Sequence, residues 1–285
     1  MGDENNAIRV RDLHKRYGEY EAVRGIDIDV PRGEVFGLLG PNGAGKTTTV
    51  EILEGYRSRT SGEVAVLGFD PAERPLELRR RIGIVLQSGG IYSHITPREA
   101  LAHWAGMYPG PRSVDEVLEL VGLQEKADER ARALSGGQLR RLDLALALIG
   151  DPELIFLDEP TTGFDPEARR AAWETIRALQ SLGMTVLLTT HYLEEAQALC
   201  DRVAIVKDGR VLAVGPPREL GVGAAHYTVA WREPGGELLV RETDDPTALL
   251  HELTGAALAR GVRLEELAVT RPTLEDVYLE LTADE

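Results

Sequence analysis

The sequence predicts an α/β fold with a mostly parallel core sheet, followed by a small α+β domain. Short, almost continuously apolar runs recur along the chain, and such runs are typical of parallel strands buried on both faces. Segments with helical patterns separate them from Ile8 to about Leu220, and this alternation predicts helices packed on a parallel sheet. The runs are "VFGLLG" (35–40), "IGIVLQ" (82–87), "LIFLDE" (154–159), "TVLLTT" (185–190) and "RVAIVK" (202–207).

The helical segments between these runs carry their own boundary signals. The segment "PEARRAAWETIRALQSLG" (166–183) has proline near its start and glycine at its end, as helices often do. Residues from about Gln87 to Leu134 contain no comparable apolar run and have mostly helical patterns. We therefore expect a helical insertion, residues 88–134, between two strands of the sheet.

The pattern changes after about residue 220, where "GVGAA" (221–225) has the composition of a linker. The following strands are expected at "HYTVAW", "GELLVRE" and "LEELAVT", and the helices at "PTALLHELTGAALARG" and "TLEDVYLELT". Thirteen acidic and five basic side chains give residues 221–285 a charge of −8. The chain is therefore divided into a domain of residues 1–220 and a small acidic domain of residues 221–285.

Composition limits the class of protein. With 285 residues and 43% hydrophobic residues, the chain can bury a full core. No apolar run approaches the roughly 20 residues that span a bilayer, and the N-terminal "MGDENNAIRV" lacks the basic and apolar regions of a signal peptide. A single cysteine, Cys200, excludes an internal disulfide and fits a reducing compartment, so a cytosolic protein is expected. The net charge of −15 disfavours general binding of nucleic acid.

The segment "GPNGAGKTT" (40–48) is a phosphate loop of the form G-x-x-x-x-G-K-[ST], set between a predicted strand and a predicted helix. Its glycines let backbone N–H groups surround a β-phosphate, Lys46 neutralises β- and γ-oxygens, and the Thr47 hydroxyl reaches Mg²⁺. The predicted nucleotide-binding residues here are Gly40, Pro41, Asn42, Gly43, Ala44, Gly45, Lys46, Thr47 and Thr48.

A pair of carboxylates follows the apolar run "LIFLDEP". Asp158 and Glu159 are placed at the carboxyl edge of a parallel sheet, where ligands bind in open α/β folds. Asp158 suits the magnesium shell, and Glu159 can polarise a water for attack on the γ-phosphate. Alone, such a pair is an ordinary solvated strand end; together with Lys46 and Thr47 it predicts a nucleoside triphosphatase.

The segment "LSGGQ" (134–138) narrows this class. Ser135 is expected to cap a helix whose first N–H groups lie bare at Gly136 and Gly137, an arrangement that favours an anion. In order and spacing, "GPNGAGKTT", "LSGGQ" and "LIFLDEP" resemble the motifs of ATP-binding cassette (ABC) ATPases. The resemblance covers about Ile8 to Leu220 and implies an N-terminal antiparallel β part, a helical subdomain, and ATP and Mg²⁺ as ligands.

In that family two cassettes pack head to tail, and the signature of one closes over the γ-phosphate bound by the other. The resemblance thus implies an ATP-dependent homodimer in which Ser135, Gly136, Gly137 and Gln138 complete a partner's site. Without the other motifs, "SGG" would indicate only a helix cap with glycines for close packing.

Further positions acquire roles from the resemblance. Tyr17 resembles the aromatic residue that stacks on adenine, with Tyr20 as the alternative. Gln87 resembles the glutamine that meets Mg²⁺ or the attacking water, and His191 resembles the histidine that contacts the γ-phosphate. Asp165 resembles the aspartate of the D-loop, which crosses the dimer interface. The family usually has leucine where this chain has Phe164, which leaves the packing of that interface open.

The C-terminal "RPTLEDVYLELT" and the segment "ILEGYRSRTSGEVAVLGFDP" resemble those of ATP-binding subunits of bacterial drug-resistance-type, daunorubicin-resistance-like exporters. This resemblance implies a separate integral-membrane permease and a peripheral place on the cytoplasmic face of a bacterial membrane. An importer ATPase and a soluble ABC ATPase without a transport role remain alternatives. A P-loop kinase or GTPase of another family would lack "LSGGQ".

Overall fold

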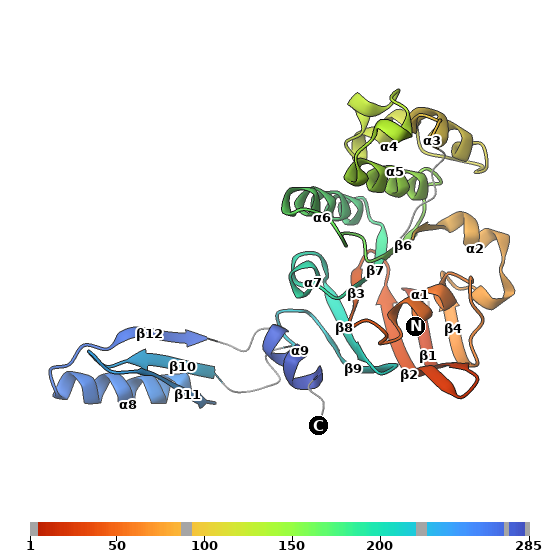
Figure 1. Ribbon diagram of the computed structural model, residues 1–285. Helices are drawn as coiled ribbons and strands as arrows, with labels where there is room; N and C mark the ends of the chain where they lie inside the picture. The colour runs from red at the N-terminus through yellow and green to blue at the C-terminus, as the bar shows by residue number, and fades with distance from the viewer. Residues whose placement is uncertain (1–4, 87–92, 221–226, 271–273, 283–285) are drawn as a thin grey trace. The chain divides into compact units, whose positions relative to one another are not determined.

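The computed structural model describes residues 5–86, 93–220, 227–270 and 274–282 (Figure 1). The contacts divide the chain into two compact units, Met1–Val214 and Gly215–Glu285. The boundary between these units lies earlier in the chain than the domain boundary that the sequence predicted after residue 220. The expected linker "GVGAA" lies outside the described residues.

The first unit is built on a six-stranded sheet with the order β5-β6-β7-β3-β8-β9. The five apolar runs form parallel neighbours in this sheet, which confirms the predicted α/β class and its mostly parallel core. The last strand is joined to β8 by the two residues Asp208 and Gly209, and so short a turn joins antiparallel strands. The strands are β5 (Ile82–Val85), β6 (Leu154–Asp158), β7 (Thr185–Thr190), β3 (Val35–Leu39), β8 (Arg202–Lys207) and β9 (Arg210–Gly215).

A second sheet of the first unit is antiparallel, as the ABC resemblance implied. It has the order β2-β1-β4, with β1 (Asn6–Tyr17), β2 (Tyr20–Pro31) and β4 (Ser61–Val66). Helix α1 (Lys46–Leu53) contacts this sheet and also β6 of the core sheet. The two sheets share one hydrophobic core around α1, because buried side chains from both belong to the same cluster.

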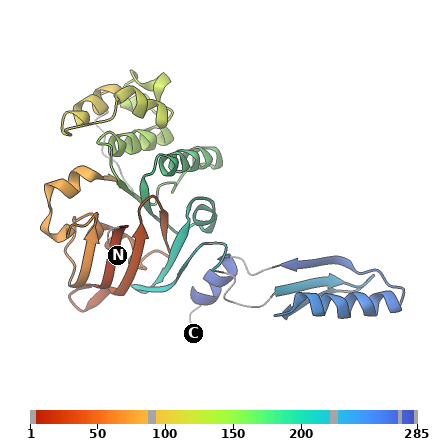
Figure 2. The same cartoon turned by 180° about the vertical axis from the view of Figure 1, so that it is seen from behind.

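Helices of the insertion gather away from the antiparallel sheet (Figures 1 and 2). The described part of the insertion is mostly helical, as predicted, and α3, α4 and the following α5 pack on one another. Helices α6 and α7 instead pack beside β7 and each other. The helices and 3₁₀ turns are η1 (Pro71–Glu73), α2 (Leu76–Arg81), α3 (Pro97–Ala105), α4 (Val114–Leu120), η2 (Gln124–Lys126), η3 (Ala131–Ala133), α5 (Gly136–Leu148), α6 (Pro166–Ser181) and α7 (Leu193–Leu199).

The second unit contains a three-stranded antiparallel sheet of order β11-β10-β12. Helix α8 contacts β10, and Val229, Trp231 and Leu249 form a small buried cluster. The elements lie where the sequence predicted them: β10 (Tyr227–Arg232), β11 (Leu238–Thr243), α8 (Pro246–Ala259), β12 (Glu265–Thr270) and α9 (Leu274–Thr282).

Candidate functional site

The phosphate loop connects β3 to α1 at the carboxyl edge of the core sheet. Gly45 precedes the helix at φ +97°, a conformation that glycine adopts readily, and a Cβ there would lie 2.5 Å from the carbonyl oxygen of Ala22. No side chain of the described residues caps α1 at Gly45. The first N–H groups of this helix therefore remain available to an anion.

Lys46 is the first residue of α1, and its side chain folds back over the loop. Its ammonium donates to the carbonyl oxygens of Gly40 at 2.7 Å and Pro41 at 3.0 Å. Although charged, the residue is only 5% exposed. Burial lowers the pKa of Lys46, while the nearby Glu159 and Asp158 carboxylates act in the opposite direction. The loop thus holds a cation among backbone groups that suit a polyphosphate.

Asp158 ends β6 beside the phosphate loop. Its Oδ1 accepts a hydrogen bond from the Thr189 hydroxyl at 2.6 Å and lies 3.4 Å from the Thr47 hydroxyl. A threonine hydroxyl and a carboxylate are the hard oxygen donors that Mg²⁺ prefers. Among the described residues no group of three or more His, Cys, Asp or Glu forms a closed metal cage. The Thr47 hydroxyl and the Asp158 carboxylate are oxygen donors of the kind that fit a magnesium ion.

Glu159 leaves the sheet with φ +46°, which is uncommon for a residue other than glycine. Such a conformation costs about 1–3 kcal/mol and persists where the surroundings over-determine it. The Glu159 N–H donates to the Thr189 hydroxyl at 3.0 Å. The carboxylate lies 3.1 Å from Nδ1 of His191 and accepts from the Thr162 hydroxyl at 3.1 Å. The structure thus brings Glu159 and His191 into direct contact.

A cavity of about 240 Å³ joins the phosphate loop to the two tyrosines considered for adenine. Tyr17 is 40% exposed and Tyr20 is 57% exposed. The Tyr17 ring already faces the Lys15 ammonium at 4.9 Å and the Arg57 guanidinium at 5.3 Å. The cavity is lined by Tyr17, Tyr20, Ala22, Asn42, Gly43, Gly45, Lys46, Thr47, Thr48 and Glu159. The predicted Gln87 lies outside the described residues.

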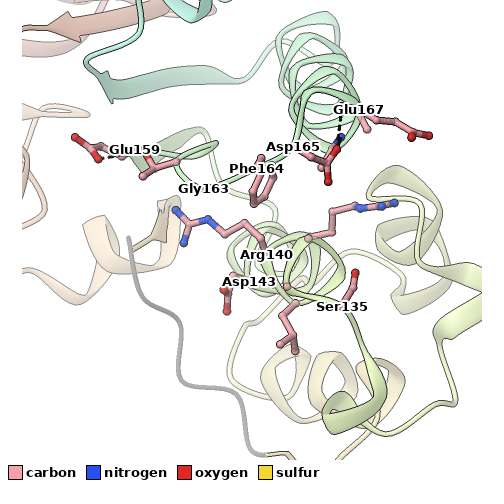
Figure 3. Close-up of a pocket in the computed structure, with 15 residues that line it drawn as sticks. Ser135, Arg140, Asp143, Glu159, Gly163, Phe164, Asp165 and Glu167 are labelled. Carbon is pink, nitrogen blue, oxygen red and sulfur yellow. Dashed lines mark hydrogen bonds between the residues drawn. The ribbon is translucent and has the colours of Figure 1, made fainter.

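The signature segment lines a different cavity, of about 780 Å³. Ser135 caps α5 as predicted: its hydroxyl accepts from the Gln138 N–H at 3.3 Å, and Gln138 accepts in return from the Ser135 N–H at 2.8 Å. In Figure 3, Ser135 and Glu159 lie at opposite ends of this cavity. Gly136 and Gly137 line it as well.

The D-loop residues Phe164 and Asp165 line the same cavity (Figure 3). Asp165 is the N-cap of α6, and one carboxylate oxygen accepts from the N–H groups of Glu167 at 3.0 Å and Ala168 at 2.9 Å. Phe164 is half-buried beside it. Asp165 thus has a structural role within its own chain that sequence reasoning did not identify.

Arg140 on α5 is a residue that the sequence did not single out. Its guanidinium donates to the Leu86 carbonyl and, at 3.1 Å, to the Asp158 carbonyl. Burial lowers its pKa, and the carboxylates of Asp143 and Asp158 oppose that shift. Arg140 therefore links the signature helix to the ends of β5 and β6.

Glu195 on α7 is a second such residue, and it is 1% exposed. It accepts from the Thr161 hydroxyl at 2.7 Å and the Trp173 indole N–H at 3.2 Å. It thereby joins the D-loop, α6 and the segment after His191. Nothing in the local sequence marks Glu195 as buried, because its partners are distant along the chain.

A groove of about 1210 Å³ lies between the core and the helical insertion. Its lining is largely apolar and includes Leu86, which is 56% exposed, and Trp104. Glu54, the C-cap of α1, also lines it. Burial raises the pKa of Glu54 to about 8, with a further contribution from the Asp158 and Glu51 charges.

A phosphate loop with a buried lysine after β3, and an Asp-Glu pair at the end of β6 on the same edge of the sheet, define a P-loop nucleoside triphosphatase. The family described as ABC transporter matches residues 23–162. The daunorubicin resistance ATP-binding protein DrrA3 of Streptomyces coeruleorubidus is 38% identical, covering 99% of this chain and 97% of the relative. The Nod factor export ATP-binding protein I of Rhizobium sp. (strain N33) is 41% identical, covering 98% of both. The chain belongs to the ABC transporter ATP-binding family, and it is an ATP-binding, ATP-hydrolysing protein of that family.

Solved structures agree with this assignment. The ADP conformation of an ATP-binding cassette of an ABC transporter superposes with a TM-score of 0.66 at 26% identity, covering 74% of this chain and 91% of that one. An ATP-binding subunit of an ABC transporter shares the fold over 97% of this chain and 100% of its own, with a TM-score of 0.70 at 24% identity. Within the described residues, no helix has the length and apolar character needed to cross a membrane.

Proposed function

We propose that this chain powers a membrane exporter by hydrolysing ATP at sites shared between two copies of itself. The observation that carries the proposal is the separation of two half-sites within one chain. Lys46 and Thr47 line one cavity, and Ser135 and Gly137 line another. Among the described residues, Glu159 is the only one that lines both. A second copy, placed head to tail, would bring its Ser135 to the nucleotide bound at Lys46.

In the proposed chemistry, the phosphate loop and Lys46 bind the β- and γ-phosphates of ATP. Glu159 accepts a proton from the attacking water, and its contact with His191 fixes the direction of its carboxylate. When Mg²⁺ is bound by Thr47 and Asp158, it supplies positive charge that offsets the charge on the phosphates. We expect Gln87 to act near the metal or the attacking water, as the resemblance implies, and the ring of Tyr17 or Tyr20 to stack on adenine.

The same chemistry explains how hydrolysis changes the state of the dimer. ATP bound between the two copies holds them together, because its γ-phosphate contacts both surfaces. Hydrolysis removes that bridge, and the copies separate. Only a difference in affinity for ATP between the closed and open states can drive this exchange.

Mixing two inactive variants tests the shared site. Lys46→Ala lacks the phosphate-loop cation, and Ser135→Arg blocks the signature surface. A mixed dimer contains one site with both defects and one site with neither, so the mixture should hydrolyse ATP faster than either variant alone. Two copies of the same variant contain no intact site and serve as the control. A mixture no faster than its components would contradict completion by a second copy.

Glu159→Gln tests the base directly. Loss of a general base reduces rate by about 10²–10⁴-fold, so this variant should bind ATP, hydrolyse it very slowly and accumulate as dimers. Size-exclusion chromatography with ATP measures the dimer. Normal turnover by Glu159→Gln would remove Glu159 from the proposed role.

The exporter part of the proposal is supported by relatives. DrrA3 is named for daunorubicin resistance, the Bacillus subtilis relative LnrL for linearmycin resistance, and another relative for Nod factor export. We assign this chain to the cytoplasmic face of a bacterial membrane, with a separate permease as its partner. The apolar groove beside Leu86 and Trp104 is the surface proposed to receive the permease. Copurification from native membranes tests this partner.

Trp104→Ala should weaken copurification of the permease without removing ATP binding, because Trp104 does not line the nucleotide cavity. Met107→Ala is the matched control, since Met107 is a 58% exposed apolar residue outside the groove. Equal recovery of the permease with both variants would place the docking surface elsewhere. Copurification with a substrate-binding protein would favour the importer alternative.

A further inference from the structure

Thr189 is a fully buried polar residue at the point where both candidate carboxylates leave the sheet. It is 0% exposed and lies in β7, one residue before the strand ends. The parallel register pairs it with Asp158 on β6 and with Leu38 on β3, next to the phosphate loop. Its hydroxyl therefore lies between the catalytic strand ends on either side.

The Thr189 hydroxyl uses both its donor and its acceptor capacity on two consecutive residues. It donates to Asp158 Oδ1 at 2.6 Å and accepts from the Glu159 N–H at 3.0 Å. An ionised carboxylate can only accept and a backbone N–H can only donate, so the direction of each bond is fixed. One hydroxyl thus bonds both to the Asp158 carboxylate and to the backbone that carries Glu159.

The backbone of Glu159 needs such a constraint. Its φ of +46° lies in a sparsely populated region, and its side chain reaches His191 and Thr162 from that conformation. The Asp158 oxygen held by Thr189 is also the oxygen 3.4 Å from the Thr47 hydroxyl. A change at Thr189 would therefore reach both the base and the magnesium ligands.

We propose that Thr189 is a positioning residue for ATP hydrolysis, which aligns Asp158 toward the metal and Glu159 toward the attacking water. This inference rests on the proposed roles of Asp158 and Glu159. The alternative is that Thr189 only satisfies buried polar groups and stabilises β7. Thr185 provides the comparison, because it is a buried threonine of the same strand whose hydroxyl accepts from the Gly33 N–H at 3.0 Å, away from both carboxylates.

Thr189→Val removes the hydroxyl and keeps the shape of the side chain and its preference for strands. We expect kcat to fall about 10- to 100-fold, because small displacements of reacting groups have effects of this size. The KM for ATP should change less than about threefold, since Lys46 and the loop are untouched. Thr189→Ser should restore most of kcat, and Thr185→Val should leave it unchanged. Thr189→Ala replaces the valine variant if that variant does not fold.

A metal-binding measurement separates positioning from a general loss of rate. Mn²⁺ is titrated into each variant with a non-hydrolysable ATP analogue and followed by electron paramagnetic resonance. The Kd for Mn²⁺ should rise several-fold in Thr189→Val and stay at the wild-type value in Thr189→Ser and Thr185→Val. Thermal unfolding of all variants shows whether the fold is retained.

Wild-type kcat and Mn²⁺ affinity in Thr189→Val would overturn the inference. So would an equal loss of kcat in Thr185→Val, which would indicate a general requirement for polar groups in β7. If Thr189→Ser were as impaired as Thr189→Val, the methyl group and not the hydroxyl would matter. Glu159→Gln is assayed beside these variants. If Glu159→Gln is inactive and Thr189→Val is normal, only the positioning role of Thr189 is contradicted. If Glu159→Gln is active, the proposed role of Glu159 as the base is contradicted.

Discussion

Two helices of the first unit begin at segments that we propose to contact phosphate, and their starts differ. Helix α1 begins after Gly45 without a side-chain cap, and its first residue, Lys46, is a buried cation. Helix α5 begins after Ser135 with a complete capping box, in which Ser135 and Gln138 satisfy each other's backbone N–H groups. The start of α5 contains no cation of its own, whereas α1 places its cation inside the loop.

The difference indicates what the start of α1 and the start of α5 each contribute to binding ATP. The start of α1 leaves its N–H groups available and the cation is already in place, so we expect the phosphate loop to bind ATP within one chain. At the start of α5 the Ser135 hydroxyl accepts from the Gln138 N–H, which leaves its O–H to donate to a phosphate oxygen. This helix start therefore offers hydrogen bonds but no cation of its own. We infer that α1 provides affinity and that α5 provides the condition for closure.

Substitutions of Lys46 and Ser135 should separate these two roles. Lys46→Ala should weaken ATP binding by about 10²–10³-fold, because removing one partner of a buried charged contact costs about 2–5 kcal/mol. Ser135→Ala should leave ATP binding by dilute, monomeric protein unchanged and reduce hydrolysis by about 10-fold or more. Equilibrium binding of a fluorescent ATP analogue and steady-state hydrolysis measure the two effects. If Ser135→Ala weakened binding to the monomer as much as Lys46→Ala, the division between the two helices would be wrong.

The sequence predicted one side of this comparison better than the other. The phosphate loop is contiguous, so the local sequence alone was enough to predict phosphate-binding roles for Lys46, Thr47 and their glycines. Ser135 was also recognised as a cap, but the reciprocal bond from Gln138 was not. The five apolar runs were predicted as buried parallel strands because each run is long enough to fill its strand.

Residues that act through distant partners could not be predicted in this way. Thr189 matters because the parallel register places it beside Asp158, and that register depends on the whole sheet. Arg140 and Glu195 have partners 18 to 54 and 22 to 34 residues away, respectively. A half-buried arginine and a buried glutamate look like surface residues until the fold supplies their partners.

A smaller effect tests the other end of α1. The pKa of Glu54 is raised from 4.5 to about 8 by burial and by neighbouring carboxylates. Between these two pH values the folded protein keeps a proton that the unfolded chain releases, so stability falls as pH rises from about 4.5 to 8 and the loss is complete above 8. Glu54→Gln should therefore match wild type near the lower value and gain stability, on the order of 1–4 kcal/mol, above the upper one.

Denaturant unfolding of both proteins at the two ends of this pH range measures the gain. Glu73→Gln, at an exposed glutamate of η1, is the control for losing one negative charge. An equal gain from Glu73→Gln would indicate relief of the overall negative charge instead of a buried carboxylate. A gain specific to Glu54 would show that burial of this carboxylate destabilises the C-terminal end of α1.

A substitution in the capping box of α5 should have the smallest effect, and it tests what this cap does. Gln138→Ala removes half of the capping box and should lower stability by about 0.5–1 kcal/mol. Helix α3 offers the matched case, because Thr96 and Glu99 form the same box away from both phosphate half-sites. Glu99→Ala should lower stability by a similar amount and leave hydrolysis unchanged. Gln138→Ala should also change the rate of hydrolysis, by about two- to fivefold, because the Ser135 N–H loses its hydrogen bond to the Gln138 side chain. Thermal unfolding and hydrolysis rates are compared for the two variants. Equal effects of both on hydrolysis would mean that the cap of α5 only stabilises its helix; an effect confined to Gln138→Ala would mean that the cap also controls how Ser135 meets its ligand.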